Sequence, residues 1–314
     1  MLAQTALASL AALGTCVGLP AGDMKDPHYW GDYMLDKYEA ERQVPAHLEP
    51  GPAPLAHPRT VLLITGVTIP AVWFDPIKAR LVRDGFRPVV YEPPALLSGD
   101  LEMNTELLAT VVDNIRAQTG EQKIDILAEC TGGLIARHYI QSLGGDEHVS
   151  RLVTFISPQH GLPKAALAFD VAGWPALTDL TPGSNFLHAV NDAPLPANVP
   201  ITSIYTSTDE YIQPYETSII PGAHNIDLGA NGFVGHFEFF WNPEIYKVMH
   251  TALTEHVAGD DPSTTPDPNT PDDPTAPDDE MTGGGCNAGG GAAGGTMLLV
   301  AFALVVGRRR LRAR

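Results

Sequence analysis

The stretch that decides the fold runs from Lys123 to Ile140 and reads Lys-Ile-Asp-Ile-Leu-Ala-Glu-Cys-Thr-Gly-Gly-Leu-Ile-Ala-Arg-His-Tyr-Ile. Residues 124–128 are a short, mostly apolar run, which predicts a buried β-strand. From Leu134 onward, apolar residues recur at helical spacing, which predicts an α-helix. Only residues 129–133 separate the strand from the helix, so the chain turns sharply between them.

This turn has the pattern small-x-Cys-x-Gly, in which Ala128 and Gly132 let the strand and the helix approach closely. The pattern is that of a nucleophile elbow, which holds one side chain above the sheet at a helix N-terminus. The residue at the apex is Cys130, where most elbows carry Ser. A lone Cys after a buried strand is also often a small core residue. The strand–turn–helix context favours the nucleophile over this alternative.

Length, charge and cysteine content limit the possible classes of protein. A chain of 314 residues can hold one large domain with extensions or two small domains. The net charge of -18 argues against a nucleic-acid partner, because phosphate neutralisation needs a basic face. The cysteines are Cys16, Cys130 and Cys286, and the outer two lie in segments with the composition of targeting signals. The folded domain therefore has one thiol and no internal disulfide.

Both ends of the chain have the composition of targeting or surface segments. Residues 1–22 are uncharged and rich in Leu and Ala, as in a secretory signal. Residues 23–58 then form an extension and a Pro-containing linker. Residues 259–285 predict an extended acidic stalk rich in Pro and Thr. Residues 286–314 contain an uncharged run long enough to span a bilayer, followed by arginines, so we expect an exported, surface-anchored or extracellular protein.

The remaining residues, 59–258, alternate apolar strand-like and helix-like segments. This alternation predicts an α/β fold with a mostly parallel, doubly wound sheet. The expected strands are 61–64, 87–91, 124–128, 151–156 and 201–205. The expected helix starts are an Asp75 N-cap, an Asn104 cap and Asn242 followed by Pro243.

The insertion at residues 159–199 interrupts the alternation, because it contains no expected strand. It is either a small cap over the site or a surface excursion.

A nucleophilic Cys needs a base, and the base needs an orienting acid. The predicted strand 201–205 runs into Asp209 and Glu210, which are the candidate acids. The expected base is His236, in a loop before the final helix, with His224 as the alternative. The acids could also be simple turn residues, for which Asp is well suited.

An oxyanion hole requires two main-chain N–H groups directed at the developing negative charge. In an elbow, the residue after the nucleophile supplies one of them, which is Thr131 here. The loop after the first core strand supplies the other, from Val67 or its neighbour Thr68.

Several motifs together are specific enough to indicate a family. They are the elbow and its helix at 124–137, the segments 142–145 and 151–161, the acid loop 205–214, and the Val-Gly-His run at 234–236. With these motifs, residues 61–256 resemble the secreted lipases of the α/β-hydrolase superfamily, both small bacterial triacylglycerol lipases and fungal B-type lipases. The resemblance implies an α/β-hydrolase fold, a lipid or small acyl-ester substrate, and Asp209 rather than Glu210 as the triad acid.

The chain departs from these lipases in two residues of the elbow, which carries Cys130 for Ser and Glu129 where lipases usually have His or Trp. The tail, Gly-Cys286 followed by a spanning run and arginines, resembles a MYXO-CTERM sorting signal, which implies processing by a sorting enzyme.

The cysteine changes the expected chemistry. A thiolate leaves more readily than an alkoxide, since a thiol has a pKa of ~8.5. The expected enzyme therefore hydrolyses carboxylic esters and thioesters through a Cys130–His236–Asp209 triad and an acyl-enzyme. An acyltransferase of the same fold and an inactive surface binding protein are the alternatives. A carboxylate at Glu129 would raise the thiol pKa, and the sequence leaves open whether His236 outweighs it. We expect a monomer without cofactor or metal.

Overall fold

The computed structural model describes residues 22–165, 168 and 172–255. The predicted signal segment up to residue 21, the acidic stalk and the sorting tail lie outside these residues. Within the described ranges, no helix is long and apolar enough to cross a membrane. The predicted spanning run at 288–307 falls outside them.

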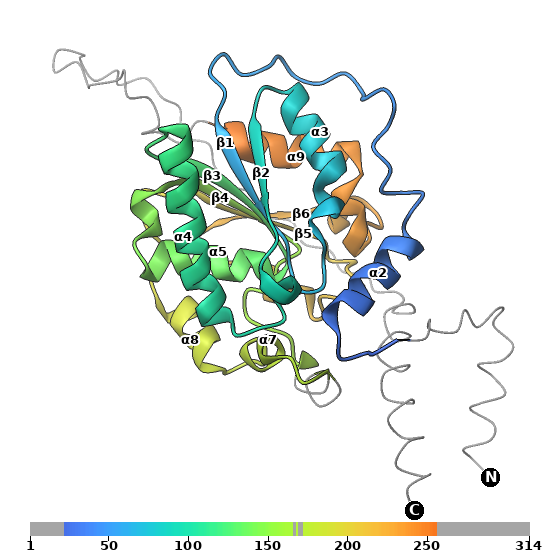
Figure 1. Cartoon of the computed structure of the whole chain (residues 1–314), viewed down its shortest axis with the longest axis vertical. Helices are drawn as coiled ribbons and strands as arrows, with labels where there is room; N and C mark the ends of the chain where they lie inside the picture. Colours follow the sequence, from blue (N-terminus) through green and yellow to red (C-terminus); the bar gives the residue numbers. More distant parts are fainter. Residues whose placement is uncertain (1–21, 166–167, 169–171, 256–314) are drawn as a thin grey trace, which may run out of the picture.

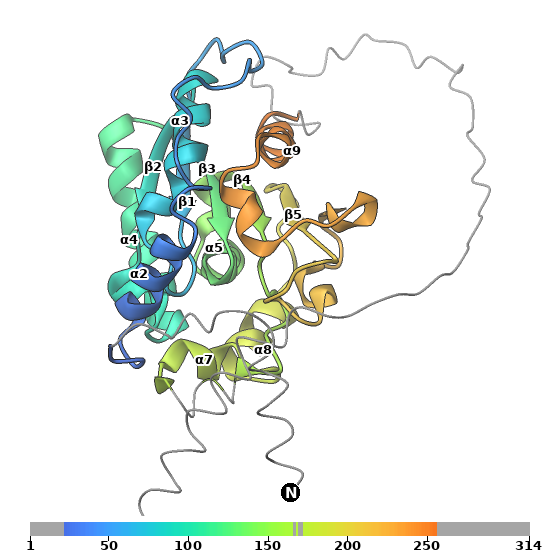
Figure 2. The same cartoon turned by 90° about the vertical axis from the view of Figure 1, so that its right-hand side faces the viewer.

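The described residues form one six-stranded sheet in the order β2-β1-β3-β4-β5-β6. Every neighbouring pair of strands is parallel, as Figures 1 and 2 show. The predicted α/β class with a doubly wound parallel sheet is confirmed. The strands are β1 (Thr60–Ile64), β2 (Arg87–Tyr91), β3 (Ile124–Glu129), β4 (Val149–Phe155), β5 (Ile201–Tyr205) and β6 (His224–Asp227).

Helices cover both faces of the sheet (Figure 1). The helices α4 and α5 pack on one face, and α3 and α9 pack on the other. The α-helices are α2 (Pro27–Lys37), α3 (Asp75–Arg83), α4 (Leu101–Thr119), α5 (Thr131–Ser142), α7 (Pro175–Asp179), α8 (Asn185–Asp192) and α9 (Pro243–Thr254). The 3-10 helices are η1 (Ala71–Phe74), η2 (Pro94–Leu97), η3 (Gly145–Glu147), η4 (Tyr215–Ser218), η5 (Gly229–Asn231) and η6 (His236–Phe240).

Strand β1 explains why the core has two halves. Its residues are buried throughout, and alternate side chains point to opposite faces of a strand. Leu62 and Ile64 join the cluster with α4 and α5. Val61 and Leu63 join the cluster with α3 and α9. A parallel sheet covered on both faces needs such continuous apolar strands, so the apolar run in the sequence is a direct consequence of the layers.

The N-terminal extension folds onto the domain through α2. The side chain of Asp26 accepts a hydrogen bond from the main-chain N–H of His28, and Pro27 opens the helix. One turn apart on the same face, Trp30 and Met34 are buried. The helix lies at the same end of the molecule as α7 and α8, which belong to the insertion at 159–199 (Figure 2).

A hydrogen bond joins the extension to the insertion. The indole Nε1 of Trp174 donates to the main-chain oxygen of Lys25 at 2.7 Å. Two segments that are far apart in the sequence therefore meet at the carboxyl end of the sheet.

Two predicted helix starts need correction. Asn104 lies inside α4 and donates to the oxygen of Asp100, whose own side chain caps the helix by accepting from Met103. Asp75 is the first residue of α3, and the cap position belongs to Phe74. The predicted cap at Asn242, by contrast, is confirmed, since its side chain accepts from the N–H of Glu244.

Candidate active site

The elbow holds Cys130 in a strained main-chain conformation between β3 and α5. Its φ is 48° and its ψ is -125°, a region that costs a non-glycine residue free energy. The flanking Gly132 makes the turn possible, because a Cβ there would lie 2.8 Å from the main-chain oxygen of Thr65. The Oγ of Ser157 donates to the Cys130 oxygen at 2.5 Å. Surrounding structure thus fixes the strained residue in place.

The loop after β5 holds the imidazole of His236. The Asp209 Oδ2 lies 2.8 Å from His236 Nδ1, and Asp209 Oδ1 accepts the N–H groups of Tyr211 and Ile212, both at 2.7 Å. The Glu210 Oε2 accepts the main-chain N–H of His236 at 3.0 Å. Both acids predicted from the sequence therefore contact His236, Asp209 at the ring and Glu210 at the main chain.

The alternative base lies elsewhere. His224 is exposed on β6 and does not line the cavity that contains Cys130.

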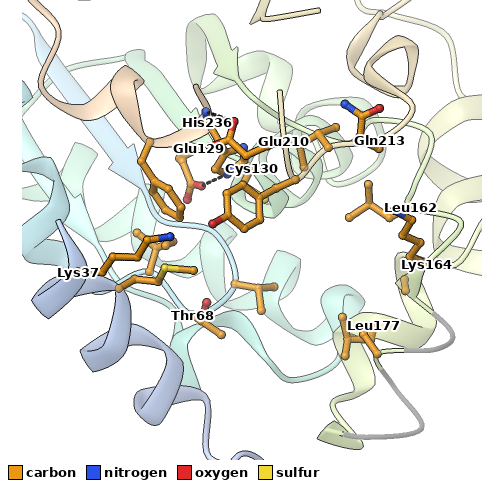
Figure 3. A pocket seen from close by; sticks show the side chains of 18 of the residues that line it. Lys37, Thr68, Glu129, Cys130, Leu162, Lys164, Leu177, Glu210, Gln213 and His236 are labelled. Carbon is orange, nitrogen blue, oxygen red and sulfur yellow. Dashed lines mark hydrogen bonds and ion pairs between the residues drawn. The ribbon is translucent and has the colours of Figure 1, made fainter. Parts of the chain in front are cut away.

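The thiol, the imidazole and a third group, Glu129, come together above the sheet (Figure 3). One ligand atom from each of Glu129, Cys130 and His236 lies within 4.8 Å of the others. Since Asp209 occupies Nδ1, the ring nitrogen that faces this group is Nε2, which lies 4.0 Å from Glu129 Oε1. The other carboxylate oxygen of Glu129 accepts the N–H of Gly66 at 2.5 Å. Sequence reasoning identified Glu129 as unusual but did not place it against His236.

The predicted oxyanion residues flank the thiol. Thr131 is the first residue of α5, and its Oγ1 lies 3.7 Å from Cys130 Sγ. Val67 lines the cavity beside Cys130. Within the described residues, the N–H of Val67 donates no main-chain hydrogen bond. The N–H of Thr68, the other candidate, already donates to the Leu96 oxygen at 2.9 Å, which favours Val67.

Burial and charge set the protonation states of the group. Burial raises the pKa of Glu129 to about 7, although His236 and the Gly66 N–H oppose the shift. Burial and the Glu129 carboxylate raise the pKa of the Cys130 thiol. Burial lowers the pKa of His236, but the charges of Asp209 and Glu129 raise it by more. The pKa of His236 therefore lies above its ordinary value. A raised thiol pKa favours the neutral form of Cys130 near pH 7.

A cavity of about 520 Å³ opens onto the thiol. Its walls come from α2, from the insertion and from the loops around His236, with apolar residues that include Met34, Leu162, Ala165, Leu177, Ile212 and Phe237. Figure 3 shows Lys37 of α2 on one side and Leu162, Lys164 and Leu177 of the insertion on the other. The chain thus places an apolar binding space in front of its elbow.

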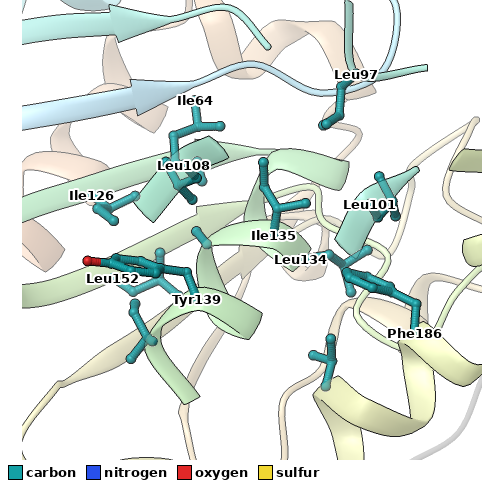
Figure 4. Close-up of a cluster of buried hydrophobic side chains, with 14 of the residues drawn as sticks. Ile64, Leu97, Leu101, Leu108, Ile126, Leu134, Ile135, Tyr139, Leu152 and Phe186 are labelled. Atoms are coloured by element: carbon teal, nitrogen blue, oxygen red, sulfur yellow. The ribbon is translucent and has the colours of Figure 1, made fainter. Parts of the chain in front are cut away.

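The core beneath this cavity fixes the position of α5. Leu134, Ile135 and Tyr139 of α5 pack with Ile64 of β1 and Ile126 of β3 in one buried cluster (Figure 4). The same helix holds the insertion in place, because Arg137 Nη1 donates to Asn191 Oδ1 at 3.1 Å. The N-terminus of α5, which carries Cys130, is therefore rigidly supported.

Comparison with known proteins points to lipases. The sequence matches no family model. Lipase B of Pseudozyma antarctica is 30% identical over 176 residues, which are 52% of this chain and 49% of that protein. The chain spans about half the length of this curated relative.

Solved structures establish the fold. The crystal structure of Aspergillus fumigatus lipase B has a TM-score of 0.56 at 21% identity, over 65% of this chain and 55% of that one. The mature form of a Bacillus licheniformis lipase has a TM-score of 0.51 at 16% identity, over 66% of this chain and 96% of that one. These similarities, with the parallel sheet and its elbow, show the α/β-hydrolase fold that the sequence predicts.

Proposed function

We propose that the protein is a carboxylic ester and thioester hydrolase that works through Cys130, His236 and Asp209. The observation that carries the proposal is the His236 imidazole, bound by Asp209 at Nδ1 over 2.8 Å, with Nε2 turned toward the elbow thiol. This arrangement is the one that nucleophilic catalysis requires, in which an oriented base stands beside the nucleophile. The similarity to lipases supports the same class of substrate.

The reaction follows from the positions of these groups. The acyl chain of the substrate lies in the apolar cavity, and its carbonyl oxygen faces the N–H groups of Val67 and Thr131. The Cys130 Sγ attacks the carbonyl carbon while its proton passes to His236 Nε2. The leaving alcohol or thiol takes that proton and departs, which leaves a thioester on Cys130. Water, deprotonated by His236, then releases the acid and restores the thiol.

Leaving-group chemistry selects the substrates. Collapse of the tetrahedral intermediate expels the better leaving group, and the Cys130 thiolate leaves more readily than a glyceryl alkoxide. An aryl oxide or a thiolate from the substrate is a leaving group of similar quality to the Cys130 thiolate, so the intermediate can also collapse toward the acyl-enzyme. We therefore expect turnover of p-nitrophenyl esters and acyl thioesters of short to medium length, with little hydrolysis of emulsified triacylglycerol.

The decisive experiment compares aryl and alkyl esters in the native chain and in Cys130→Ser. The serine variant should lower the ratio of aryl-ester to alkyl-ester kcat/KM by about 10-fold or more, since an alkoxide nucleophile is no longer the better leaving group. Cys130→Ala serves as the control and should lose turnover of both esters. Equal rates on triacylglycerol and aryl esters in the native chain would contradict the thiolate argument.

A second function is supported by Glu129. Its carboxylate lies 4.0 Å from His236 Nε2 and raises the pKa of the thiol, which suits a lipase scaffold that binds acyl compounds without turning them over. This binding protein would retain affinity for fatty acids in the cavity, while neither the native chain nor Cys130→Ser would hydrolyse any ester. An acyltransferase would be distinguished from both by its product. With an added alcohol it would form a new ester of that alcohol in place of the free acid.

Export and surface display complete the proposal. They rest on the uncharged N-terminal segment and on the stalk and tail beyond residue 258. Protease treatment of intact cells should remove the domain, and a chain that ends before the tail should appear in the medium. Protection of the domain from protease in intact cells would contradict surface display.

A further inference from the structure

The chemistry proposed above uses Cys130 and His236 but gives Glu129 no task. Nevertheless, Glu129 is 1% exposed and points into the same small space as the thiol and the imidazole (Figure 3). Thiolate sulfur, imidazole nitrogen and carboxylate oxygen are the three kinds of ligand that Zn²⁺ prefers in proteins. Their convergence therefore needs an explanation beyond the triad.

The free oxygen of Glu129 points to a ligand. Glu129 Oε2 is held by the Gly66 N–H at 2.5 Å, whereas Oε1 is buried without a hydrogen-bond partner among the described residues. A buried carboxylate oxygen that accepts no hydrogen bond is costly, and the imidazole of His236, at 4.0 Å, is too far away to donate one. A cation at this place would satisfy it, while the bond to Gly66 keeps the carboxylate oriented.

The surroundings of His236 are those of a metal ligand. A ligating histidine almost always gives its other ring N–H to a carboxylate, a main-chain carbonyl or a water, which fixes the ring and raises its basicity. Asp209 does this at 2.8 Å. Asp209 and Glu129 also place two buried carboxylates around one imidazole, and buried negative charges are normally paired with a cation or coordinate a metal.

The distances between the three ligand atoms are only slightly longer than those of a tetrahedral zinc site. Zn–N and Zn–S bonds of about 2.0–2.3 Å place tetrahedral ligand atoms about 3.3–3.7 Å apart. The Glu129 and His236 ligand atoms are 4.0 Å apart, and the whole group lies within 4.8 Å. Binding therefore requires the three ligand atoms to move somewhat closer together.

We propose that Glu129, Cys130 and His236 form a binding site for Zn²⁺, and that the bound ion reversibly masks the elbow thiol. The thiol proton passes to solvent when the thiolate binds the metal. The fourth coordination position faces the cavity, where water completes the tetrahedron. This site differs from the sequence expectation of no metal, and its affinity does not depend on whether the protein hydrolyses esters.

The experiment uses the full chain with Cys16→Ser and Cys286→Ser, so that Cys130 is the remaining thiol. Zn²⁺ is titrated calorimetrically at pH 7.5 in two buffers of different ionisation enthalpy, and Co²⁺ is titrated with detection of its thiolate charge-transfer absorption. We expect one equivalent of Zn²⁺, release of a proton, and a Co²⁺ absorption band. Cys130→Ser should abolish this band, and Glu129→Gln should weaken Zn²⁺ binding about 10–100-fold.

Control variants distinguish Zn²⁺ binding at the proposed site from Zn²⁺ binding to other acidic residues. Glu106→Gln changes an exposed glutamate of α4 that lies outside the cavity, and it should change the affinity less than 3-fold. Zn²⁺ affinity that is equal in the parent, Cys130→Ser and Glu129→Gln would place the ion elsewhere, for example on the acidic stalk, and would overturn the proposal. Absence of a stoichiometric site in the parent would overturn it as well.

Inhibition is tested separately from binding. If p-nitrophenyl esters are turned over, Zn²⁺ should inhibit the native chain, a chelator should restore the activity, and Glu129→Gln should be less sensitive to the ion. An inactive chain that still binds Zn²⁺ through Cys130 would contradict the proposed hydrolase and leave the metal site standing.

Discussion

At the scale of single residues, the site depends on the balance between Cys130 and Glu129. The elbow and the N-terminus of α5 favour a reactive thiol, whereas burial and the adjacent carboxylate favour the neutral form. The raised pKa of the thiol favours the neutral form in the free protein. Catalysis by such a thiol requires transfer of its proton to His236 during attack, so Glu129 controls how reactive the nucleophile is.

Glu129→Gln should make Cys130 more reactive near pH 8. Since burial raises the Glu129 pKa to about 7, the carboxylate is charged at pH 8 and disfavours the thiolate. Removal of this charge should accelerate alkylation by iodoacetamide about 10-fold at pH 8, because one pKa unit changes the thiolate fraction tenfold. At pH 5.5 Glu129 is already protonated, and the change should be small. The measurement follows the mass shift of the Cys130 peptide in chelator-treated protein.

Glu106→Gln is the control for this reaction. It removes an exposed carboxylate of α4 that lies outside the cavity, so we expect a change of less than 2-fold. Equal acceleration by Glu129→Gln at both pH values would show that the access of iodoacetamide to Cys130, and not the charge of Glu129, limits the alkylation rate.

The same residue predicts how stability depends on pH. The folded-state pKa of Glu129 lies above its ordinary value of 4.5, so the folded protein binds more protons than the unfolded chain between these two values. Its contribution is most favourable below pH 4.5, and it is lost as the pH rises toward 7 and above.

Glu129→Gln replaces the carboxyl group by one that does not titrate. It should therefore raise the free energy of unfolding relative to the native chain by up to about 3 kcal/mol at pH 8, and by much less at pH 5. Urea denaturation with chelator at both pH values measures the difference. A difference that is the same at pH 5 and pH 8 would show that Glu129 does not titrate in this window.

At the scale of elements, the strands and the elbow were predictable because their signals are local. Strands β2 and β5 have the predicted bounds. Every residue of β5 is buried, whereas β2 lies at an edge of the sheet and is partly exposed. The cap at Asn242 was correct for a similar reason, because an Asn before Pro243 combines two helix-start signals.

Elements that pack at the margins of the sheet were missed. Strand β6 is short, polar and at an edge, and its sequence carries no apolar alternation. The start of α2 does carry a signal in Asp26 and Pro27. Its buried Met34 lines the cavity, a long-range contact that the local sequence does not record. The contact between Glu129 and His236 joins residues 107 positions apart, and no periodicity in the sequence records such a contact.

The insertion provides a prediction at this scale. Leu162 lines the cavity from the insertion and is half-buried, so a larger side chain should occupy space that the acyl chain needs. Leu162→Trp should raise KM for a p-nitrophenyl octanoate at least 5-fold and leave the acetate nearly unchanged. The ratio of kcat/KM for the two esters is the measurement. An equal loss of kcat/KM for both esters would indicate that the substitution disturbs the elbow and does not simply fill the cavity. Leu162→Met is the size-matched control.

At the scale of the whole molecule, the described fold is complete within one segment of the chain. The sheet and its covering helices extend from α2, which begins at Pro27, to α9, which ends at Thr254. Both core clusters are built from residues within these limits. The segment after residue 259 has a composition that cannot bury enough apolar surface to fold, so the stability of the domain should not depend on it.

A chain that ends at Gly259 should therefore remain soluble and unfold cooperatively. Its unfolding temperature should lie within about 2 °C of that of the longer chain, because the core clusters of the described residues extend only from Met34 to Leu253. Differential scanning calorimetry of both chains measures this, with a chain that ends at Asn242 as the control. That control removes α9 with Ile245, Met249 and Leu253, which are buried in the core cluster that also contains residues of β4 and α3, and should lose the cooperative transition. If the chain ending at Gly259 loses the transition as well, the acidic segment packs on the domain, and the predicted division into domain and stalk is wrong.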